Sequence, residues 1–423
     1  MEIIKRGNIN LFRVNKLMNR HNNLKLSIIL LFIFIFSCTF KVQALDNIQF
    51  QRMTVEDGLS QSTINAIIQD SKGYIWIGTN DGLDRYDGHE IKSYNPYKDI
   101  NTQLSSNYIT SLGEDSKGYI WVGTNDGVSK IDVTNWNITN YKDFFNTTIS
   151  DILVMSNGEI LVATLNEIYL YNEKEDKFNQ ILQNEKNPYN KEIYSIDEDE
   201  YKNLWVGTNK GLIKINENKK DIKSYTYSEE EHSISENTIR KVYCDKNGYV
   251  WIGTFSSGLN RIDLKTGKIK VYKNDENNNK SLPSNYINSI LRDNNGDLWV
   301  GTDDGLAKLI KGKDEFKVYK NNKFNNYSLV DNKVYNLMQD KNGIIWVGTY
   351  VGISKFDPNN NIKYYSSQLD EIPLSSDIIH GIYEDKNGKT WIGTSDRGIN
   401  IIDFKNDTIE YLDKDDGLTG NSI

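Results

Sequence analysis

The feature that most constrains the fold is a repeated strand-and-turn motif built around tryptophan. The stretch GYIWIGTNDG at residues 73–82 recurs at 118–127 with Val122 in place of Ile77. Further copies follow at spacings of 40 to 48 residues, and a worn copy carries leucine in place of tryptophan. A fixed period of this length indicates supersecondary units that share a continuous core with their neighbours. The eight anchors are Trp76, Trp121, Leu161, Trp205, Trp251, Trp299, Trp346 and Trp391.

Each repeat has the pattern of four antiparallel strands. An alternating strand such as INAIIQD precedes the tryptophan strand, and two further strands such as LDRYD and EIKSYN follow it. An aspartate stands six residues before every tryptophan anchor, and a glycine usually stands three before it. We interpret these residues as hairpin formers, because aspartate accepts backbone N–H groups inside a turn and glycine adopts positive φ. A calcium site is disfavoured, since each turn offers a single acid. The turn aspartates are Asp70, Asp115, Asp199, Asp245, Asp293, Asp340 and Asp385.

Four short strands in each of several consecutive repeats predict an all-β fold, a β-propeller of four-stranded antiparallel blades. The 26 tyrosines, eight tryptophans and 30 glycines against five prolines agree with strands and tight turns. Both faces of the strand YIWIGT carry residues that need burial, which a blade packed between two other blades provides. Burying one tryptophan contributes at most about 4 to 6 kcal/mol.

The copy number leaves two ring sizes open. A seven-bladed ring over residues 45–368 is favoured, with 369–423 as an eighth repeat and the start of a ninth, which would begin a second propeller. An eight-bladed ring would use all eight copies. In either ring we expect the early strand NIQFQRM, residues 47–53, to complete the last sheet and leave no open edge.

The N-terminal 44 residues predict export. An uncharged apolar run at 26–40 lies between Lys25 and Lys41 and precedes the small-residue cleavage pattern VQA at 42–44. An uncleaved N-terminal anchor and a lipidated Cys38 are the alternatives. Without this basic leader, the chain's formal charge falls from −8 to about −14. So acidic a domain should repel nucleic acid and anionic membranes.

Residues 50–88, FQRMTVEDGLSQSTINAIIQDSKGYIWIGTNDGLDRYDG, resemble the first blade of the two-component regulator propeller proteins, and the resemblance extends from Ile48 to Ile423. It implies an extracytoplasmic sensor propeller, commonly one of two consecutive seven-bladed rings. A histidine kinase or diguanylate cyclase output usually follows in the family, and the ligands are often carbohydrate fragments. No such output motif is present here, so we expect it on a missing C-terminal part or on another chain.

Strand parity predicts where a ligand binds. The second connection of each blade lies on the same face as the long inter-blade links, and variable loops on a rigid scaffold are where recognition usually occurs. The alternative is that these positions only form turns. The candidate ligand-binding residues are Asn80, Asp81, Asn125, Asp126, Asn209, Phe255, Asp303, Asp304, Tyr350 and Asp396.

Other chemistry has little support in the sequence. The four histidines are scattered, and His232 belongs to an acidic stretch that we interpret as a solvated loop. Cys244 is interpreted as a small buried residue. No nucleophile elbow, phosphate loop or paired-histidine zinc motif occurs, so we expect no catalytic residue, no metal and no cofactor. A sensor that binds a small molecule, plausibly an oligosaccharide, is favoured. A polysaccharide lyase or glycosidase and a protein-binding propeller are the alternatives, and a homodimer is left open.

Overall fold

The computed structural model describes residues 48–423 except 95–103, 143, 146, 182–191, 219–220, 231, 360–364, 366, 368–372 and 407. The described chain forms two compact units, residues 48–362 and 363–423, which we treat separately. The apolar run at 26–40, with its predicted cleavage after Ala44, lies outside the described residues. In the part that is described, no helix combines the length and apolar character needed to cross a bilayer.

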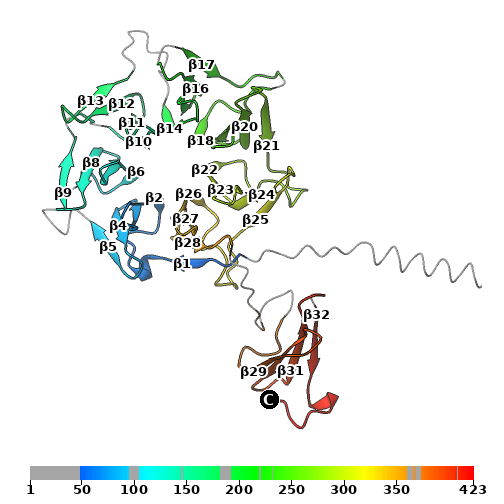
Figure 1. Ribbon diagram of the computed structural model, residues 1–423. Coiled ribbons are helices and arrows are strands. Elements are labelled where there is room, and N and C mark those ends of the chain that lie inside the picture. The colour runs from blue at the N-terminus through cyan, green and yellow to red at the C-terminus, as the bar shows by residue number, and fades with distance from the viewer. Residues whose placement is uncertain are drawn as a thin grey trace, which may run out of the picture. The chain divides into compact units, whose positions relative to one another are not determined.

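The first unit contains seven four-stranded antiparallel sheets arranged in a ring (Figure 1). We call them blades 1 to 7 in chain order. The innermost strands are β2 (Ile64–Gln69), β6 (Ile109–Glu114), β10 (Ile149–Val154), β14 (Ile193–Glu198), β18 (Ile239–Cys244), β22 (Ile287–Arg292) and β26 (Val334–Gln339). The second strands, which carry the anchor residues, are β3 (Ile75–Thr79), β7 (Tyr119–Thr124), β11 (Ile160–Thr164), β15 (Leu204–Thr208), β19 (Tyr249–Thr254), β23 (Leu298–Thr302) and β27 (Ile345–Thr349).

The two outer strands of each blade follow in the same order, except in the last blade. The third strands are β4 (Gly82–Tyr86), β8 (Gly127–Asp132), β12 (Ile168–Asn172), β16 (Gly211–Ile215), β20 (Leu259–Asp263), β24 (Gly305–Leu309) and β28 (Ile353–Phe356). The outermost strands are β5 (Ile91–Tyr94), β9 (Asn137–Asn140), β13 (Lys177–Gln180), β17 (Ile222–Tyr225), β21 (Ile269–Tyr272), β25 (Phe316–Tyr319) and, in blade 7, β1 (Gln51–Met53). The fold is therefore an all-β propeller, and its sheets span residues 51–356.

The early strand closes the ring, as the sequence predicts. β1 pairs antiparallel with β28, with Gln51 opposite Lys355 and Met53 opposite Ile353. The Arg52 guanidinium donates to the backbone oxygens of Asn325, Ser328 and Leu329 in the link before blade 7. This link therefore anchors the strand, and β1 serves as the outermost strand that blade 7 would otherwise lack.

The core lies between blades, with one apolar cluster at each junction. Trp76 packs with Ile109 and Val122 of blade 2, and the same arrangement repeats around the ring. Trp346 of blade 7 packs with Ile64 and Ile77 of blade 1, so the circle of clusters is complete. Five of the tryptophans are among the largest fully buried side chains of the protein. They are Trp76, Trp121, Trp205, Trp251 and Trp299.

The glycine that follows each tryptophan at two positions permits this close packing. A Cβ placed on Gly78 would lie 2.5 Å from Ile109 Cγ2, at the start of the next innermost strand. Neither the backbone of Gly78 nor the Ile109 side chain can move away, because each is held in its own sheet. Any larger residue at position 78 would therefore push the two blades apart. The worn copy accepts alanine, Ala163, at the equivalent position.

The turn aspartates do more than the sequence predicts. Asp70 Oδ1 accepts the backbone N–H groups of Lys72 and Tyr74, which is the expected turn. Its second oxygen, Oδ2, accepts the indole N–H of Trp76 at 2.9 Å. The same aspartate–indole bond recurs in every described repeat that has a tryptophan anchor. Each aspartate therefore ties the turn to the buried ring.

A cation opposite the tryptophan completes this unit, and sequence reasoning missed it. Lys355 lies opposite Trp346 in the pairing of β28 with β27, and its Nζ stands 5.0 Å from the ring centroid. Stacked lysine or arginine recurs over the tryptophans of blades 2, 4, 5 and 6. In the worn blade the same pairing joins Leu161 to Leu170, so both members of the pair are replaced together.

The second unit is a single four-stranded sheet in the order β29 (Ile379–Glu384), β30 (Thr390–Thr394), β31 (Ile399–Asp403) and β32 (Thr408–Leu412). A short 3₁₀ turn, η3 (Lys414–Asp416), follows and has the same capping box as η1 (Val55–Asp57) before blade 1. Ile382 and Tyr383 of β29 are 69% and 65% exposed. This sheet therefore has a blade's secondary structure but little of its core.

Candidate functional site

The two ends of the strands form two distinct faces of the propeller. Gly82, in the second turn of blade 1, donates its N–H to the oxygen of Asn107 in the link between blades 1 and 2. Gly258 and Gly305 make the same bond to Asn285 and Asn332. The second turns and the links therefore share one face, as strand parity predicts. We call it the link face, and the face with the first and third turns the turn face.

A β-bulge at the start of each innermost strand aims one side chain at this face. In blade 1 the register shifts between Ile64 and Ala66, which leaves Asn65 as the extra residue. The bulge recurs at the same point in all eight sheets, and bulges of this kind re-aim side chains next to functional sites. The bulge residues are Asn65, Thr110, Ser150, Tyr194, Arg240, Asn288, Tyr335 and, in the second unit, His380.

Sequence reasoning missed these bulge residues, although a signal existed. Each stands eleven residues before its anchor, as Asn65 does before Trp76. They vary in type where the surrounding residues repeat, which is typical of positions that do not hold the fold. Without the strand register, however, the extra residue could not be told from an ordinary inward-facing one.

Six of the predicted site residues lie beside the bulge residues, at the position four after the anchor. Asn65 donates to Asn80 Oδ1 at 2.9 Å, and Asn288 donates to Asp303 Oδ1 at 2.8 Å. The structure thus brings these predicted residues to one rim, which surrounds the start of the innermost strands. The six are Asn80, Asn125, Asn209, Phe255, Asp303 and Tyr350.

Three of the four remaining predicted residues are bonded to neighbouring segments. Asp81 accepts from Asn107, and Asp304 accepts from both Asn332 and Lys320. The carboxylate of Asp126 pairs with Lys142. These bonds tie second turns to neighbouring segments, so a turn-forming role accounts for them. Asp396 belongs to the second unit.

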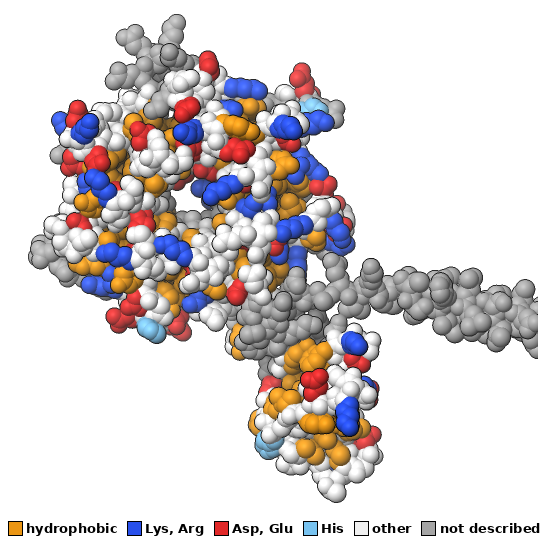
Figure 2. Space-filling model, viewed as in Figure 1, with side chains coloured by type: hydrophobic (Ala, Val, Ile, Leu, Met, Phe, Trp, Pro, Cys, Tyr) orange, Lys and Arg blue, Asp and Glu red, His pale blue; other side chains and the backbone are white. Residues whose placement is uncertain are grey.

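The ring is hollowed at its centre, where the innermost strands face one another (Figure 2). Several polar atoms of these strands have no hydrogen-bond partner among the described residues. They include Thr110 Oγ1, Ser111 Oγ, Asn288 Oδ1, Ser289 Oγ and Asn336 Oδ1. Buried polar atoms of this kind need water or a ligand as partner. The innermost strands therefore carry buried polar atoms that bond nothing in the described part of the chain.

Aromatic side chains gather on one part of the rim. The rings of Phe255 and Tyr286 meet edge to face with centroids 5.4 Å apart, and the Arg240 guanidinium lies 5.8 Å from the Phe255 centroid. The ring centroids of Tyr335 and Tyr350, both of blade 7, are 6.5 Å apart. Burial raises the pKa of Tyr335, the negative charge of Asp303 raises it further, and the positive charge of Arg240 opposes both.

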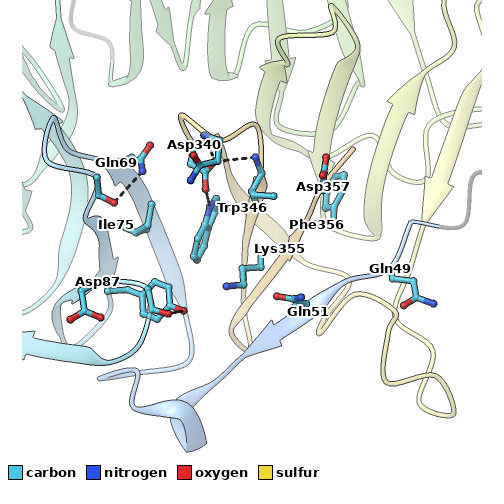
Figure 3. A pocket seen from close by; sticks show the side chains of 15 residues that line it. Gln49, Gln51, Gln69, Ile75, Asp87, Asp340, Trp346, Lys355, Phe356 and Asp357 are labelled. Carbon is cyan, nitrogen blue, oxygen red and sulfur yellow. Dashed lines mark hydrogen bonds between the residues drawn. The ribbon is translucent and has the colours of Figure 1, made fainter. Parts of the chain in front are cut away.

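The turn face has a groove that sequence reasoning did not find. It lies between blades 7 and 1, has a volume of about 530 Å³, and is lined by residues of β1, β3 and β28 and by nearby turns (Figure 3). Lys355 extends into it beside Trp346, and burial lowers the pKa of this lysine. Gln51 from β1 and Gln69 from β2 contribute amide groups.

The described part of the chain has neither a metal-binding cluster nor an activated thiol. No group of three histidine, cysteine or acidic side chains is arranged there to hold a metal ion. Cys244 is partly exposed, not fully buried as the sequence suggested, and it packs at the edge of the cluster around Trp205. Burial raises the pKa of its thiol, which makes the thiolate scarce. His232 lies exposed in its loop.

Comparison with known proteins supports the architecture. The extracellular domain of a hybrid two-component system of B. thetaiotaomicron superposes with a TM-score of 0.70 at 25% identity, over 89% of this chain and 50% of that domain. Virginiamycin B lyase from Staphylococcus aureus shares the fold at 15% identity and a TM-score of 0.55, over 73% of this chain and 99% of the lyase.

A relative with a curated name matches a shorter stretch. Histidine kinase P4 of Formosa agariphila is 44% identical over 59 residues, which is 14% of this chain and 4% of the kinase. This chain thus spans half of the solved extracellular domain and a small part of the kinase.

A family model describes the repeats themselves. The two component regulator propeller model matches residues 58–81, 103–126, 188–210, 233–256, 281–304, 328–351 and 373–396. Each match runs from an inter-blade link to the second turn, so it covers the bulge and the rim residue. Only the worn third copy goes unmatched among the eight. With these repeats and its propeller fold, the chain belongs to the two-component regulator propeller family.

Proposed function

We propose that this chain is the sensing part of an extracytoplasmic receptor and that its ligand is an oligosaccharide. The observation that carries the proposal is the match over 89% of the chain to the extracellular domain of a hybrid two-component system. The rim supports the choice of ligand, because aromatic rings stack on sugar faces while asparagine and aspartate bind hydroxyls. A histidine kinase or cyclase, elsewhere in the full protein or on another chain, would read the bound state.

The second unit supports a proposal about the longer architecture, that residues 369–423 begin a second propeller. Ile423 Cγ2 would lie 2.9 Å from a Cβ on Gly393, as Ile109 does near Gly78. The His380 ring nitrogen meets the Ile423 oxygen at 3.0 Å, as Asn65 meets the Ile109 oxygen. Ile423 thus occupies the position of the first residue of a following innermost strand.

Binding and turnover separate sensing from catalysis. The purified chain would be titrated calorimetrically with oligosaccharides from several plant and algal polysaccharides, and each mixture would be incubated and analysed by mass spectrometry. We expect saturable binding of at least one sugar and no new product. Formation of shorter or unsaturated fragments would establish a lyase or glycosidase instead. Absence of binding across the panel would contradict the proposed ligand class.

Export is tested by fusing alkaline phosphatase after Ile423, since this enzyme is active only outside the cytoplasm. We expect activity from the fusion to the full chain and none from the same fusion lacking residues 1–44. Equal activity of the two fusions, or none from either, would contradict an extracytoplasmic location.

A further inference from the structure

The bulge residues of three consecutive blades converge on one sector of the rim. Arg240, Asn288 and Tyr335 are the extra residues of β18, β22 and β26. Asn288 spans the junction of its blade by donating to Asp303 Oδ1 and to the oxygen of Val334. The charges of Arg240 and Asp303 both act on the Tyr335 hydroxyl, so blades 5, 6 and 7 share one electrostatic environment.

Two groups in this sector have bonding capacity that the described chain does not use. Arg240 is partly buried against the Phe255 ring, and among the described residues it has no hydrogen bond or ion pair. The Oδ1 atom of Asn288, a residue only 8% exposed, likewise accepts no hydrogen bond there. A guanidinium pre-positioned on an aromatic ring has its planar donor edge free for a carboxylate or sulfate.

Exposed aromatic surface surrounds these groups. Phe255 is 46% exposed, Tyr286 39% and Tyr350 51%, and together they form an exposed aromatic patch. Lys333 Nζ lies 5.5 Å from the Tyr350 ring and adds a second positive charge. Rigid aromatic faces with adjacent hydrogen-bonding groups are typical of small-molecule sites.

The sector of blades 1 to 3 on the same rim is different in chemistry. Blades 1 to 3 place Asn65, Thr110 and Ser150 at the bulge positions, and Ser150 donates to backbone oxygens of its own blade. No arginine or lysine stands at these bulges. The scaffold is thus sevenfold repetitive, but its rim is chemically asymmetric.

We propose that the rim sector of blades 5 to 7 is an acidic-sugar site, in which Arg240 binds a carboxylate or sulfate of the ligand. Phe255 and Tyr350 stack on sugar rings, while the Asp303 carboxylate accepts sugar hydroxyls. This inference rests on the proposed oligosaccharide ligand and adds its charge class and its location.

The test uses acidic tetrasaccharides together with neutral counterparts of the same rings. Oligogalacturonate, hyaluronan and alginate fragments would each be titrated by calorimetry beside their methyl-esterified forms, and heparin fragments beside their desulfated, esterified forms. We compare the wild-type chain with Arg240→Gln. The matched control is Lys246→Gln, which removes one positive charge from an exposed turn of the same blade on the turn face. Circular dichroism and melting curves check that the variants fold.

We expect at least one acidic sugar to bind at least about tenfold more tightly than its neutral form. Arg240→Gln should remove most of that difference, and Lys246→Gln should keep it. If a neutral sugar binds as well as its acidic form, or if Arg240→Gln has no effect, the acidic-sugar site is wrong while the sensing proposal stands. If no sugar of either kind binds, both proposals fail.

Discussion

At the scale of single residues, the fold rests on a unit of aspartate, tryptophan and an opposing cation. The aspartate–indole bond fixes the ring, the cation covers one of its faces, and the next blade covers the other. Spacing in the sequence predicted that the tryptophan is buried between blades and that the aspartate forms a turn. It could not predict the indole bond, because that depends on a side-chain direction. A signal for the cation existed, because a lysine or arginine stands nine or ten residues after every tryptophan anchor of the ring. Only the strand register shows that the two side chains lie opposite each other.

Trp346→Ala should lower the free energy of unfolding by about 3 to 5 kcal/mol, because it opens a cavity between blades 7 and 1. The measurement is urea unfolding followed by the remaining tryptophan fluorescence. A loss under about 1 kcal/mol would mean that the ring is not buried between sheets.

Asp340→Asn should lower the free energy of unfolding by about 1 to 3 kcal/mol. The amide of asparagine has one oxygen, so it can accept either the indole N–H of Trp346 or the backbone N–H of Ile344, and its N–H₂ group faces the other donor. The matched control is Asp385→Asn in the second unit, where Trp391 is less buried and the same bond is worth less. Urea unfolding measures the loss of free energy of unfolding in both variants. Equal losses would contradict the claim that burial strengthens the aspartate–indole bond.

At the scale of elements, closure of the ring depends on a strand of three residues. β1 alone contributes few backbone bonds, so its attachment relies on the Arg52 side chain. The sequence predicted the closing strand, because residues 47–53 precede the first repeat and have no partner within it. The anchoring by Arg52 was not foreseen, since its acceptors lie some 275 positions away in the chain.

Arg52→Gln should therefore weaken the pairing of β1 with β28, the closing seam of the ring, without unfolding the whole molecule. We expect hydrogen exchange to accelerate in β1 and β28 while blades 3 to 5 keep their protection. Lys92→Gln on the outermost strand of blade 1 is the control, since that residue is exposed. A uniform change across all blades would argue that β1 has no separate closing role.

The junction of blades 4 and 5 should make stability depend on pH. Burial raises the pKa of Asp197 to about 6, although bonds from the backbone N–H groups of Cys244 and Glu198 oppose this shift. Because the folded state holds this proton more tightly than the unfolded state does, the carboxyl group favours folding at low pH. That contribution is lost as the pH rises from about 4 to 6.

Asp197→Asn, which stays neutral, should consequently raise the melting temperature relative to wild type above about pH 7. The gain should shrink as the pH falls through the same window, where the native carboxyl group becomes neutral as well. Scanning calorimetry of both proteins across this range measures it. A difference that does not vary with pH would contradict the raised pKa.

At the scale of the whole molecule, repetition explains how much the sequence could predict. The blades, their four strands and the shared face of second turns and links all follow from a period that recurs eight times. The asymmetric rim could not be predicted in the same way, because it arises from the positions that do not repeat. The bulge residues of the rim, including Arg240 and Tyr335, were identified only from the strand register.

The central claim is that residues 51–356 form one closed ring, sealed by β1 against β28. A disulfide between cysteines at positions 51 and 355 tests it most directly, because these residues are paired across the seam. Gln51→Cys with Lys355→Cys, in a chain with Cys38 and Cys244 replaced by serine, would be oxidised and mapped by peptide mass spectrometry. The control pairs Gln51→Cys with Lys308→Cys, the equivalent position of blade 6. The closed ring predicts a bond within one monomer in the first variant and none in the second; no bond in the first, or bonds in both, would contradict it.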